Sequence, residues 1–298
     1  MNYNLNGSSV PLWQATNTIP IFPPLTNNTK ADVCIIGGGI GGISTAYLLS
    51  KNGKKVILID ANLIGGGETG RTTAHFFPPD EWYSKIEKSF STDVARLIAR
   101  GFSQATNLVE YIIEEEQIEC SFERVTGYLY SLSDKGFIDL HKELEAANRS
   151  GVTAQIVEQV PEISFSTGPA IQFPNQAQFH PLKYLQGLTK AFLDNGGVIH
   201  CDTRALSIEG NNTLQKVSTN GGEINCQAVV VATNTPFNDT IVLHTKQAAY
   251  RTYVIGLRIP NGSVPHILMW DHGHPYYYLR IAKPDPNSDH EILVVGGA

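Results

Sequence analysis

The amino-acid sequence predicts an α/β fold, with one doubly wound domain in separated segments and an inserted domain built on a large mixed or antiparallel sheet. An apolar strand at 31–36, an amphipathic helix at 40–51 and a second strand at 55–60 form a βαβ unit, whose strands should be parallel. The segment 227–233, which is apolar from Ala228 to Ala232, is typical of a strand in a buried parallel sheet. After it the pattern changes to strands with few helices between them, at 247–259, 266–271, 276–282 and 290–296.

The order of these elements predicts one domain interrupted by another. Helices are expected at 90–118, 135–150 and 182–195, and strands at 122–132 and 197–201. The expected segments are an N-terminal arm at 1–28 packed through Trp13, the doubly wound domain at 29–118 and 179–240, and the inserted domain at 119–178 and 241–298.

Composition and charge exclude several classes of protein. The 298 residues are 42% hydrophobic and only 17% charged, which predicts a sizeable core rather than disorder. The net charge is −6 without a basic run, so nucleic acid is not an expected partner. No apolar stretch reaches the roughly 18 residues of a membrane span. The N-terminus lacks the basic and apolar regions of a secretory signal, so a cytoplasmic location is expected.

The cysteines predict neither a metal site nor a disulfide framework. They are widely spaced and form no CxxC pair. Buried thiols in a reducing compartment are the simpler interpretation. The four residues are Cys34, Cys120, Cys201 and Cys226.

Glycines 37, 39 and 42 form a G-x-G-x-x-G pattern between the first strand and the helix that follows it. In this pattern Gly37 permits a tight turn, Gly39 lets the backbone approach a pyrophosphate, and Gly42 lets helix and strand pack closely. The helix N-terminus then offers free N–H groups and a partial positive charge to phosphates. The motif in this context predicts a dinucleotide site rather than a glycine turn without a ligand.

Asp60 and the loop after it indicate which dinucleotide is bound. A carboxylate at the end of the second strand can accept hydrogen bonds from a ribose diol and would repel the extra phosphate of NADP. A second loop rich in glycine and threonine follows directly at 64–75. NAD domains rarely need such a loop, whereas the ribityl chain and ring of FAD must be held by a second stretch of backbone. The two loops therefore predict FAD.

These residues resemble the D-amino-acid-oxidase-like superfamily of FAD-dependent oxidoreductases, which includes glycine oxidase and sarcosine oxidase. The resemblance spans about residues 11–298 and rests first on the glycine motif, Asp60 and the loop 69–74. The residues of the later loops are similar to those of a branch whose members often carry a C-terminal Rieske iron–sulfur domain. The looser matches are His180-Pro181, Tyr184-Leu185, Leu188, Thr203-Arg204-Ala205, Val231-Ala232-Thr233-Asn234-Thr235-Pro236, and the stretches 275–280 and 292–297.

The resemblance implies a Rossmann-type FAD-binding domain in discontinuous segments with an inserted α+β substrate domain. The three glycines would hold the pyrophosphate and Asp60 the adenosine ribose. The Ala205 backbone would border adenine, while Thr233 and Asn234 would close over the adenosine half; a plain strand residue in a core is the alternative for Ala205. The loop that would line the pyrophosphate and the flavin consists of Thr69, Gly70, Arg71, Thr72, Thr73 and Ala74.

The implied activity is oxidation of an amine or amino-acid C–N bond by hydride transfer to the flavin. An arginine of this superfamily often binds a substrate carboxylate, which suits a bidentate fork. Arg280 and Arg251 are the candidates, with a surface or interface ion pair as the alternative for each. Tyr278 is a candidate for covering a ring, although three consecutive tyrosines at 276–278 cannot all face one side of a strand, which favours packing.

Non-covalent FAD is expected. Some relatives attach FAD through a histidine near the threonine-rich loop, one position earlier than His75, where this chain has Ala74. His272 and His274 superficially suggest a metal pair, but no third ligand stands near them in the sequence, which favours a turn.

The end of the sequence predicts a truncated chain. The apolar strand 292–295 runs straight into Gly296 and Gly297, whereas termini are usually polar and exposed. No iron–sulfur ligands are present, so an iron–sulfur partner would lie in the missing part. Three alternatives stay open: an electron-transfer flavoprotein working with that partner, a catalytically inactive FAD-binding fragment, and an FAD monooxygenase, which usually needs an NADPH-contact motif not found here.

Overall fold

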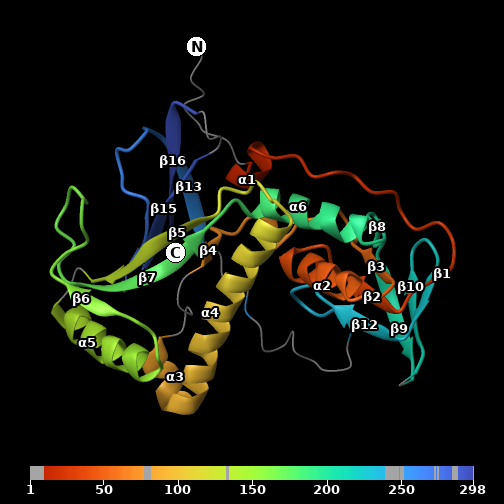
Figure 1. Ribbon diagram of the computed structural model, residues 1–298, viewed down its shortest axis with the longest axis horizontal. Helices are drawn as coiled ribbons and strands as arrows, with labels where there is room; N and C mark the ends of the chain where they lie inside the picture. Colours follow the sequence, from red (N-terminus) through yellow and green to blue (C-terminus); the bar gives the residue numbers. More distant parts are fainter. Residues whose placement is uncertain are drawn as a thin grey trace. The chain divides into compact units, whose positions relative to one another are not determined.

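The computed structural model divides into two compact units, each assembled from three stretches of chain (Figure 1). Unit 1 comprises Met1–Thr72, Glu116–Cys120 and Pro181–Ala249, and unit 2 comprises Thr73–Glu115, Ser121–His180 and Tyr250–Ala298. The structure describes residues 10–76, 82–131, 134–211, 213–238, 248, 252–271, 273, 275–283 and 288–297, with the backbone alone described at 134–138.

Unit 1 is built on a parallel sheet with the order β12-β2-β3-β8. All neighbouring strands run parallel, which confirms the doubly wound prediction. The central strands β2 (Val33–Ile36) and β3 (Val56–Ile59) are buried at every residue. The edge strands are β8 (Val198–His200) and β12 (Ala228–Val231). The expectation of full burial at 227–233 is wrong, because β12 lies at the edge of the sheet that the described residues form and is only half-buried or exposed.

Two helices pack against each other in unit 1 (Figure 1). Helix α2 (Ile40–Lys51) buries Ile43 and Tyr47 on one face. Helix α6 (Pro181–Asp194) buries Leu185 and Leu188 along its core-facing side. Both faces follow the spacing of apolar residues in the sequence, so each helix begins and ends close to where it was expected.

A second sheet of unit 1 has the order β1-β11-β10-β9. It encloses an apolar cluster with β2 and β3 that contains Leu25, Val217 and Ile224. Its strands are short and mostly half-exposed, so their periodicity is weak and the sequence did not predict this sheet. The strands are β1 (Thr29–Lys30), β9 (Ala205–Gly210), β10 (Gln215–Thr219) and β11 (Glu223–Cys226).

The N-terminal arm is anchored through Trp13, as the sequence predicts. Trp13 lies in the single-turn helix α1 (Leu12–Ala15) and is 5% exposed. Its indole Nε1 donates a hydrogen bond of 2.6 Å to the carbonyl oxygen of Thr72. The arm is therefore tied to the end of the threonine-rich loop.

All four cysteines are free, buried and located in unit 1. Burial raises the pKa of the Cys34 thiol far above its ordinary value, and the neighbouring Cys226 adds to this effect. Burial also raises the pKa of Cys201 and of Cys226. These buried side chains therefore fill the core of unit 1.

Unit 2 contains an eight-stranded sheet among the described residues, with the order β13-β16-β15-β14-β5-β7-β4 and β6 attached to β7. Strands β14 and β5 pair in parallel and the other pairs are antiparallel, which confirms a large mixed sheet. The strands are β4 (His75–Phe76), β5 (Glu123–Tyr130), β6 (Gln155–Val157), β7 (Ala170–Gln178), β13 (Tyr253–Pro260), β14 (Ile267–Asp271), β15 (Tyr277–Ala282) and β16 (His290–Gly297).

The described residues of unit 2 form the helices α3 (Tyr83–Ser89), α4 (Thr92–Glu115) and α5 (Asp134–Arg149) (Figure 1). We expected residues 29–118 to belong to the doubly wound domain, but 73–115 lies in unit 2. The physical reason is a shared core, since these helices bury apolar side chains together with β5 and β7. The cluster includes Tyr83, Ile86, Ala95, Ala99, Leu129, Leu140, Ala146, Ile171 and Phe173.

A buried carboxylate joins two of these helices. Glu143 of α5 is 3% exposed and accepts hydrogen bonds from the backbone N–H groups of Tyr83 (2.7 Å) and Ser84 (2.9 Å) at the start of α3. Glu143→Ala would leave both donors unpaired, and we expect a loss of about 2–3 kcal/mol in the free energy of unfolding. Urea denaturation followed by tryptophan fluorescence measures it.

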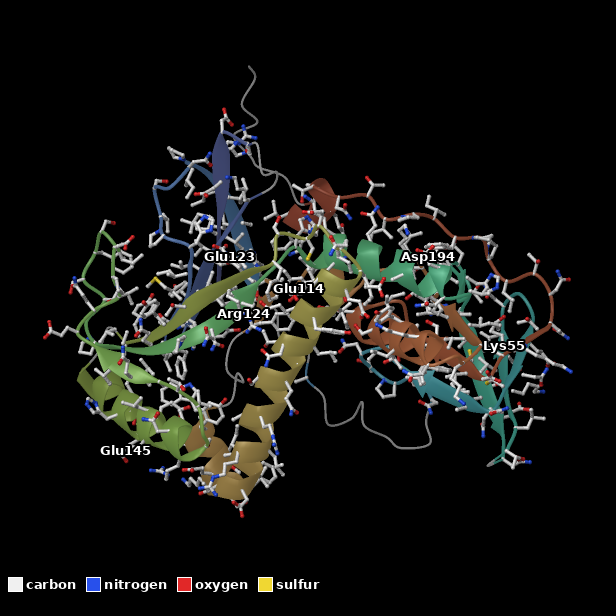
Figure 2. All side chains as sticks on the ribbon, viewed as in Figure 1. Lys55, Glu114, Glu123, Arg124, Glu145 and Asp194 are labelled. Carbon is white, nitrogen blue, oxygen red and sulfur yellow. The ribbon has the colours of Figure 1, made fainter. Side chains whose placement is uncertain are left out.

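The control for this variant is Glu145→Ala. Glu145 lies two residues further along α5, is labelled in Figure 2, and is 73% exposed beside Arg149 at 3.7 Å. An exposed pair of this kind contributes about 0–1 kcal/mol. Equal losses in the two variants would contradict a special role for the Glu143 carboxylate.

Candidate cofactor site

The glycine motif forms the turn between β2 and α2. Gly37 has a φ of +112°, and a Cβ atom there would lie 2.4 Å from the carbonyl oxygen of Ala232. A Cβ atom on Gly42 would lie 1.8 Å from the carbonyl oxygen of Gly37. Side chains at Gly37 and Gly42 would therefore collide with backbone, so both glycines serve close packing of strand and helix.

Gly39 differs from these two glycines. Its backbone is extended, with φ −78° and ψ −177°, and it is the residue before the first turn of α2. A Cβ atom there would meet one neighbour within 4 Å, the Thr69 hydroxyl oxygen at 3.2 Å. The space that a Gly39 side chain would fill is thus open rather than packed with backbone.

The first turn of α2 presents amide donors to this space. Thr69 Oγ1 accepts a 3.0 Å hydrogen bond from the N–H of Ile40. No acceptor in the described part of the chain reaches the N–H groups of Gly39 and Gly41. Free donors at a helix N-terminus favour an anionic group, so the residues present fit a pyrophosphate.

Asp60 follows β3 and lies beside the glycine turn. Its Oδ2 accepts a 2.7 Å hydrogen bond from the N–H of Gly38, and its Oδ1 accepts one of 2.7 Å from the N–H of Asn62. An ionised carboxylate has about four acceptor positions, so capacity for the hydroxyl groups of a ribose remains. Asp60 thus shapes the turn and keeps acceptors for a ligand.

The second loop folds against the same turn. The N–H of Gly65 donates to the carbonyl oxygen of Gly38 at 2.9 Å. Thr69 and Gly70 are buried in the 3₁₀ helix η1 (Glu68–Gly70). Arg71 is exposed, and its Nη1 donates to the carbonyl oxygens of Gly66 (2.7 Å) and Gly67 (3.0 Å). The Arg71 guanidinium therefore stabilises the conformation of the loop to which it belongs.

The two later segments lie on either side of the glycine turn. The N–H of Thr203 donates to the carbonyl oxygen of Asp60 at 2.8 Å, two residues before Ala205. The Ala205 side chain packs on the apolar cluster beneath, which leaves its backbone as the part that could border a ligand. Thr233 follows Ala232 beside Gly37, and Asn234 adopts a left-handed φ of +65°.

Unit 2 contains the last two residues of the predicted loop. Ala74 is 4% exposed and has a left-handed φ of +56°. The next residue, His75, has its Nδ1 3.0 Å from the Thr73 hydroxyl. Burial, followed by the charge of Arg280, lowers the pKa of His75 to about 3, so the ring is neutral at physiological pH.

Tyr278 and Arg280 converge on this segment from one face of β15. The Tyr278 ring meets His75 edge to face, with 5.8 Å between ring centroids. Arg280 is 3% exposed, and its Nη1 donates to the carbonyl oxygens of Thr73 (3.0 Å) and Ala74 (2.8 Å). Arg280 was expected to bind a substrate carboxylate, whereas in the structure its Nη1 donates to backbone carbonyl oxygens.

Three residues considered above lie outside the described residues: Arg251, His272 and His274. Sequence reasoning also missed Glu123 and His266, which interact near Arg280. No sequence signal could have paired them, because the two positions are far apart in the chain and neither belongs to a motif.

No helix in the described ranges is both long and apolar enough to cross a membrane. Within the same ranges, no group of three or more His, Cys, Asp or Glu side chains is arranged to hold a metal ion.

Comparison with known sequences gives two informative relatives. YhfW of Bacillus subtilis, named as a Rieske 2Fe-2S iron–sulfur protein, is 33% identical over 270 residues, covering 90% of this chain and 53% of the relative. The gamma-glutamylputrescine oxidoreductase of Escherichia coli is 27% identical over 237 residues, covering 76% of this chain and 54% of the relative. The chain therefore spans about half the length of these curated relatives.

Solved structures share the fold. Glycine oxidase from Geobacillus kaustophilus has a TM-score of 0.64 at 18% identity, covering 89% of this chain and 70% of that protein. The L-amino acid deaminase from Proteus myxofaciens has a TM-score of 0.66 at 16% identity, covering 93% of this chain and 60% of that protein. Identities this low show the fold alone.

The family model described as FAD dependent oxidoreductase (DAO) matches residues 32–298. The match starts one residue before β2 and takes in the glycine motif, Asp60 and both units. It confirms the resemblance to the D-amino-acid-oxidase-like superfamily. The chain belongs to the DAO family of FAD-dependent oxidoreductases.

Proposed function

We propose that this chain binds FAD non-covalently and oxidises a C–N bond of a small amine or amino-acid substrate by hydride transfer. The observation that carries the proposal is the open space at Gly39, which free N–H groups of α2 border. Backbone atoms pack against the Cβ positions of Gly37 and Gly42, whereas only the Thr69 hydroxyl approaches that of Gly39. Asp60 supplies the ribose acceptor that an adenosine group needs.

Bound FAD supplies the hydride acceptor, and the protein binds and orients the two reactants. The first turn of α2 would hold the pyrophosphate, and Asp60 would hold the ribose. The loop from Thr69 to Ala74 would line the pyrophosphate and flavin side, with Ala205, Thr233 and Asn234 around the adenosine half. The family match supports this assignment, since the motif residues lie within the matched range.

The non-covalent mode rests on the loop sequence. Ala74 stands where the resembling proteins place an attached histidine, and alanine offers no nucleophile. The Nδ1 of the neighbouring His75 already interacts with the Thr73 hydroxyl inside unit 2. Both observations favour a cofactor that leaves the protein when the fold is lost.

The names of two relatives support the proposed substrate class. The names of the Escherichia coli oxidoreductase and of glycine oxidase refer to an amine and an amino acid. A second candidate function is electron transfer to an iron–sulfur partner, which the similarity to YhfW over 90% of this chain favours. In both cases the chain takes electrons into FAD, and the two functions differ in the group that receives them.

The test is chemical identification of the cofactor. We expect acid or heat denaturation of the purified protein to release a yellow compound with the absorption spectrum and retention time of FAD, leaving a colourless pellet. NAD or FMN alone in the supernatant would overturn the FAD assignment, and a yellow pellet would overturn the non-covalent mode.

Anaerobic titration of the FAD-loaded protein then separates the functions. Bleaching of the flavin absorbance by amines or amino acids supports C–N oxidation, and reoxidation by a Rieske protein but not by oxygen favours electron transfer. If the protein binds FAD but no amine or amino acid reduces the flavin, the chain is the catalytically inactive FAD-binding fragment, which is one of the alternatives that the sequence allows.

A further inference from the structure

The Arg280 guanidinium donates hydrogen bonds to backbone carbonyl groups of unit 2. It lies on β15 and is 3% exposed. Its Nη1 donates to three backbone carbonyl oxygens, those of Thr73 (3.0 Å), Ala74 (2.8 Å) and Phe179 (3.2 Å). Its Nε donates to the carbonyl oxygen of Ile281 at 3.3 Å. One side chain thus ties β15 to the segment before β4 and to the residue after β7.

The segment that Arg280 binds has an unfavourable backbone conformation. Ala74 is left-handed with φ +56°, a region in which an L-residue with a Cβ atom is strained. Such a conformation persists when surrounding contacts over-determine it, and such residues concentrate at functional sites. Here the contacts are the hydrogen bonds from Arg280 to the carbonyl oxygen of Thr73, which precedes Ala74, and to that of Ala74 itself.

The charge of Arg280 is balanced by a carboxylate that other groups hold in place. Glu123, at the start of β5 and labelled in Figure 2, interacts electrostatically with Arg280. It accepts hydrogen bonds of 3.0 Å from Gln178 Nε2 and from His266 Nδ1. His266 Nε2 lies 2.8 Å from the 4% exposed Glu291. Strands β5, β7 and β16 thus share one polar network.

The ionisation states within this network are fixed at neutral pH. Hydrogen bonds to Glu123 and to Glu291 raise the pKa of His266 to about 9, although partial burial opposes them. Burial alone would raise the pKa of Glu123, but the bonds from His266 and Gln178 hold it below its ordinary value. Burial lowers the pKa of Arg280 to about 9, which still leaves the guanidinium charged at pH 7.

We propose that Arg280 is a positioning residue, whose guanidinium holds the segment Thr73–His75 in its left-handed turn. It would thereby keep Thr73 and Ala74 in the conformation in which they would line the flavin. Its planar fork reaches acceptors in several directions at once, which a lysine ammonium on a flexible stem does not reproduce. The effect on FAD rests on the proposed function, whereas the anchoring of Thr73–His75 does not.

The experiment compares four variants of the full chain. Arg280→Lys keeps the charge and loses the fork, and Arg280→Met removes both. Arg280→Lys combined with Ala74→Gly removes the cost of the left-handed turn. The matched control is Arg258→Met, which changes an exposed arginine on β13 of the same unit.

Amide hydrogen exchange of the apoprotein reports the anchoring directly. We expect exchange in peptides covering 73–76 to rise at least about tenfold in Arg280→Lys and in Arg280→Met, with the helices α4 and α5 unchanged. We expect Arg258→Met to match the wild type. Unchanged exchange at 73–76 in a folded Arg280→Lys protein would overturn the proposal. If Arg280→Met does not fold, the lysine variant decides alone.

FAD titration by flavin fluorescence reports the consequence. We expect Arg280→Lys to weaken FAD binding by about tenfold, and the added Ala74→Gly to restore about two- to fivefold of this loss. A lysine variant with wild-type affinity and wild-type exchange would refute the positioning role. If the wild type itself does not bind FAD, the proposed function fails, and the exchange measurement still decides whether Arg280 anchors the segment.

Discussion

Gly39→Val is expected to abolish measurable FAD binding while unit 1 stays folded. The extended backbone of Gly39 suits any residue, and a Cβ atom there meets only the Thr69 hydroxyl. Valine would instead occupy the space beside the free N–H groups, where a pyrophosphate has to approach. Loss of those contacts should raise the dissociation constant by more than about 100-fold, since each 1.4 kcal/mol is a factor of ten.

Fluorescence titration of the apoprotein with FAD measures the loss, and circular dichroism checks the fold. Gly101→Ala is the matched control, because Gly101 lies in α4 outside the proposed site, a Cβ atom there has no neighbour within 4 Å, and alanine favours a helix. Gly42→Val should fail to fold, since its Cβ atom would lie 1.8 Å from a carbonyl oxygen. Stoichiometric FAD in Gly39→Val would show that the pyrophosphate lies elsewhere.

Asp60→Ala is expected to weaken FAD binding by about one to two powers of ten. A carboxylate bound to a ribose makes charge-assisted hydrogen bonds of roughly 1.5–3 kcal/mol. The change also removes the acceptor of the Gly38 N–H, which holds the turn in shape. Asp60→Asn, which keeps one side-chain oxygen but no charge, should give an intermediate affinity by the same fluorescence titration.

Asp32→Ala serves as the control for Asp60. Asp32 precedes β2, at the opposite end of that strand from the glycine turn, and its Oδ2 likewise accepts a backbone hydrogen bond, from Lys55 at 2.8 Å. Its loss removes a comparable bond without touching the proposed site. Equal weakening of FAD in the two alanine variants would mean that Asp60 acts through stability and not through the ribose.

The βαβ unit and its glycine turn could be predicted from the sequence because their signals are local. The helix from Ile40 to Lys51 has the bounds expected, since Gly39 precedes it and Gly53 follows with a left-handed φ of +76°. The edge position of β12 could not be predicted, because an apolar strand looks the same in the centre of a sheet and at its edge.

Strand β7 was missed for a definable reason. Pro174 and the left-handed Asn175 interrupt its pattern, and proline argues against a strand. The structure accommodates both at a register shift, where β5 passes from Val125 to Gly127 while β7 passes from Gln176 to Phe173. Bulges of this kind leave no periodic signal.

The anchoring contacts of Arg280 were equally invisible in the sequence. Its carbonyl partners Thr73 and Ala74 lie more than 200 positions earlier in the chain. A backbone carbonyl carries no residue signature, so only the pairing of strands brings donor and acceptors together. The sequence could indicate Arg280 as a functional arginine, but only the fold shows which groups its side chain contacts.

The distribution of thiols and indoles gives each unit its own reporter. The four buried cysteines all lie in unit 1, whereas Trp82 and Trp270 lie in unit 2. A thiol reagent can react only after a thiol becomes accessible and ionises, so its labelling kinetics follow the opening of unit 1. With Trp13 replaced by phenylalanine, the remaining fluorescence follows unit 2 alone. Labelling and fluorescence recorded on one sample would therefore time the unfolding of each unit separately.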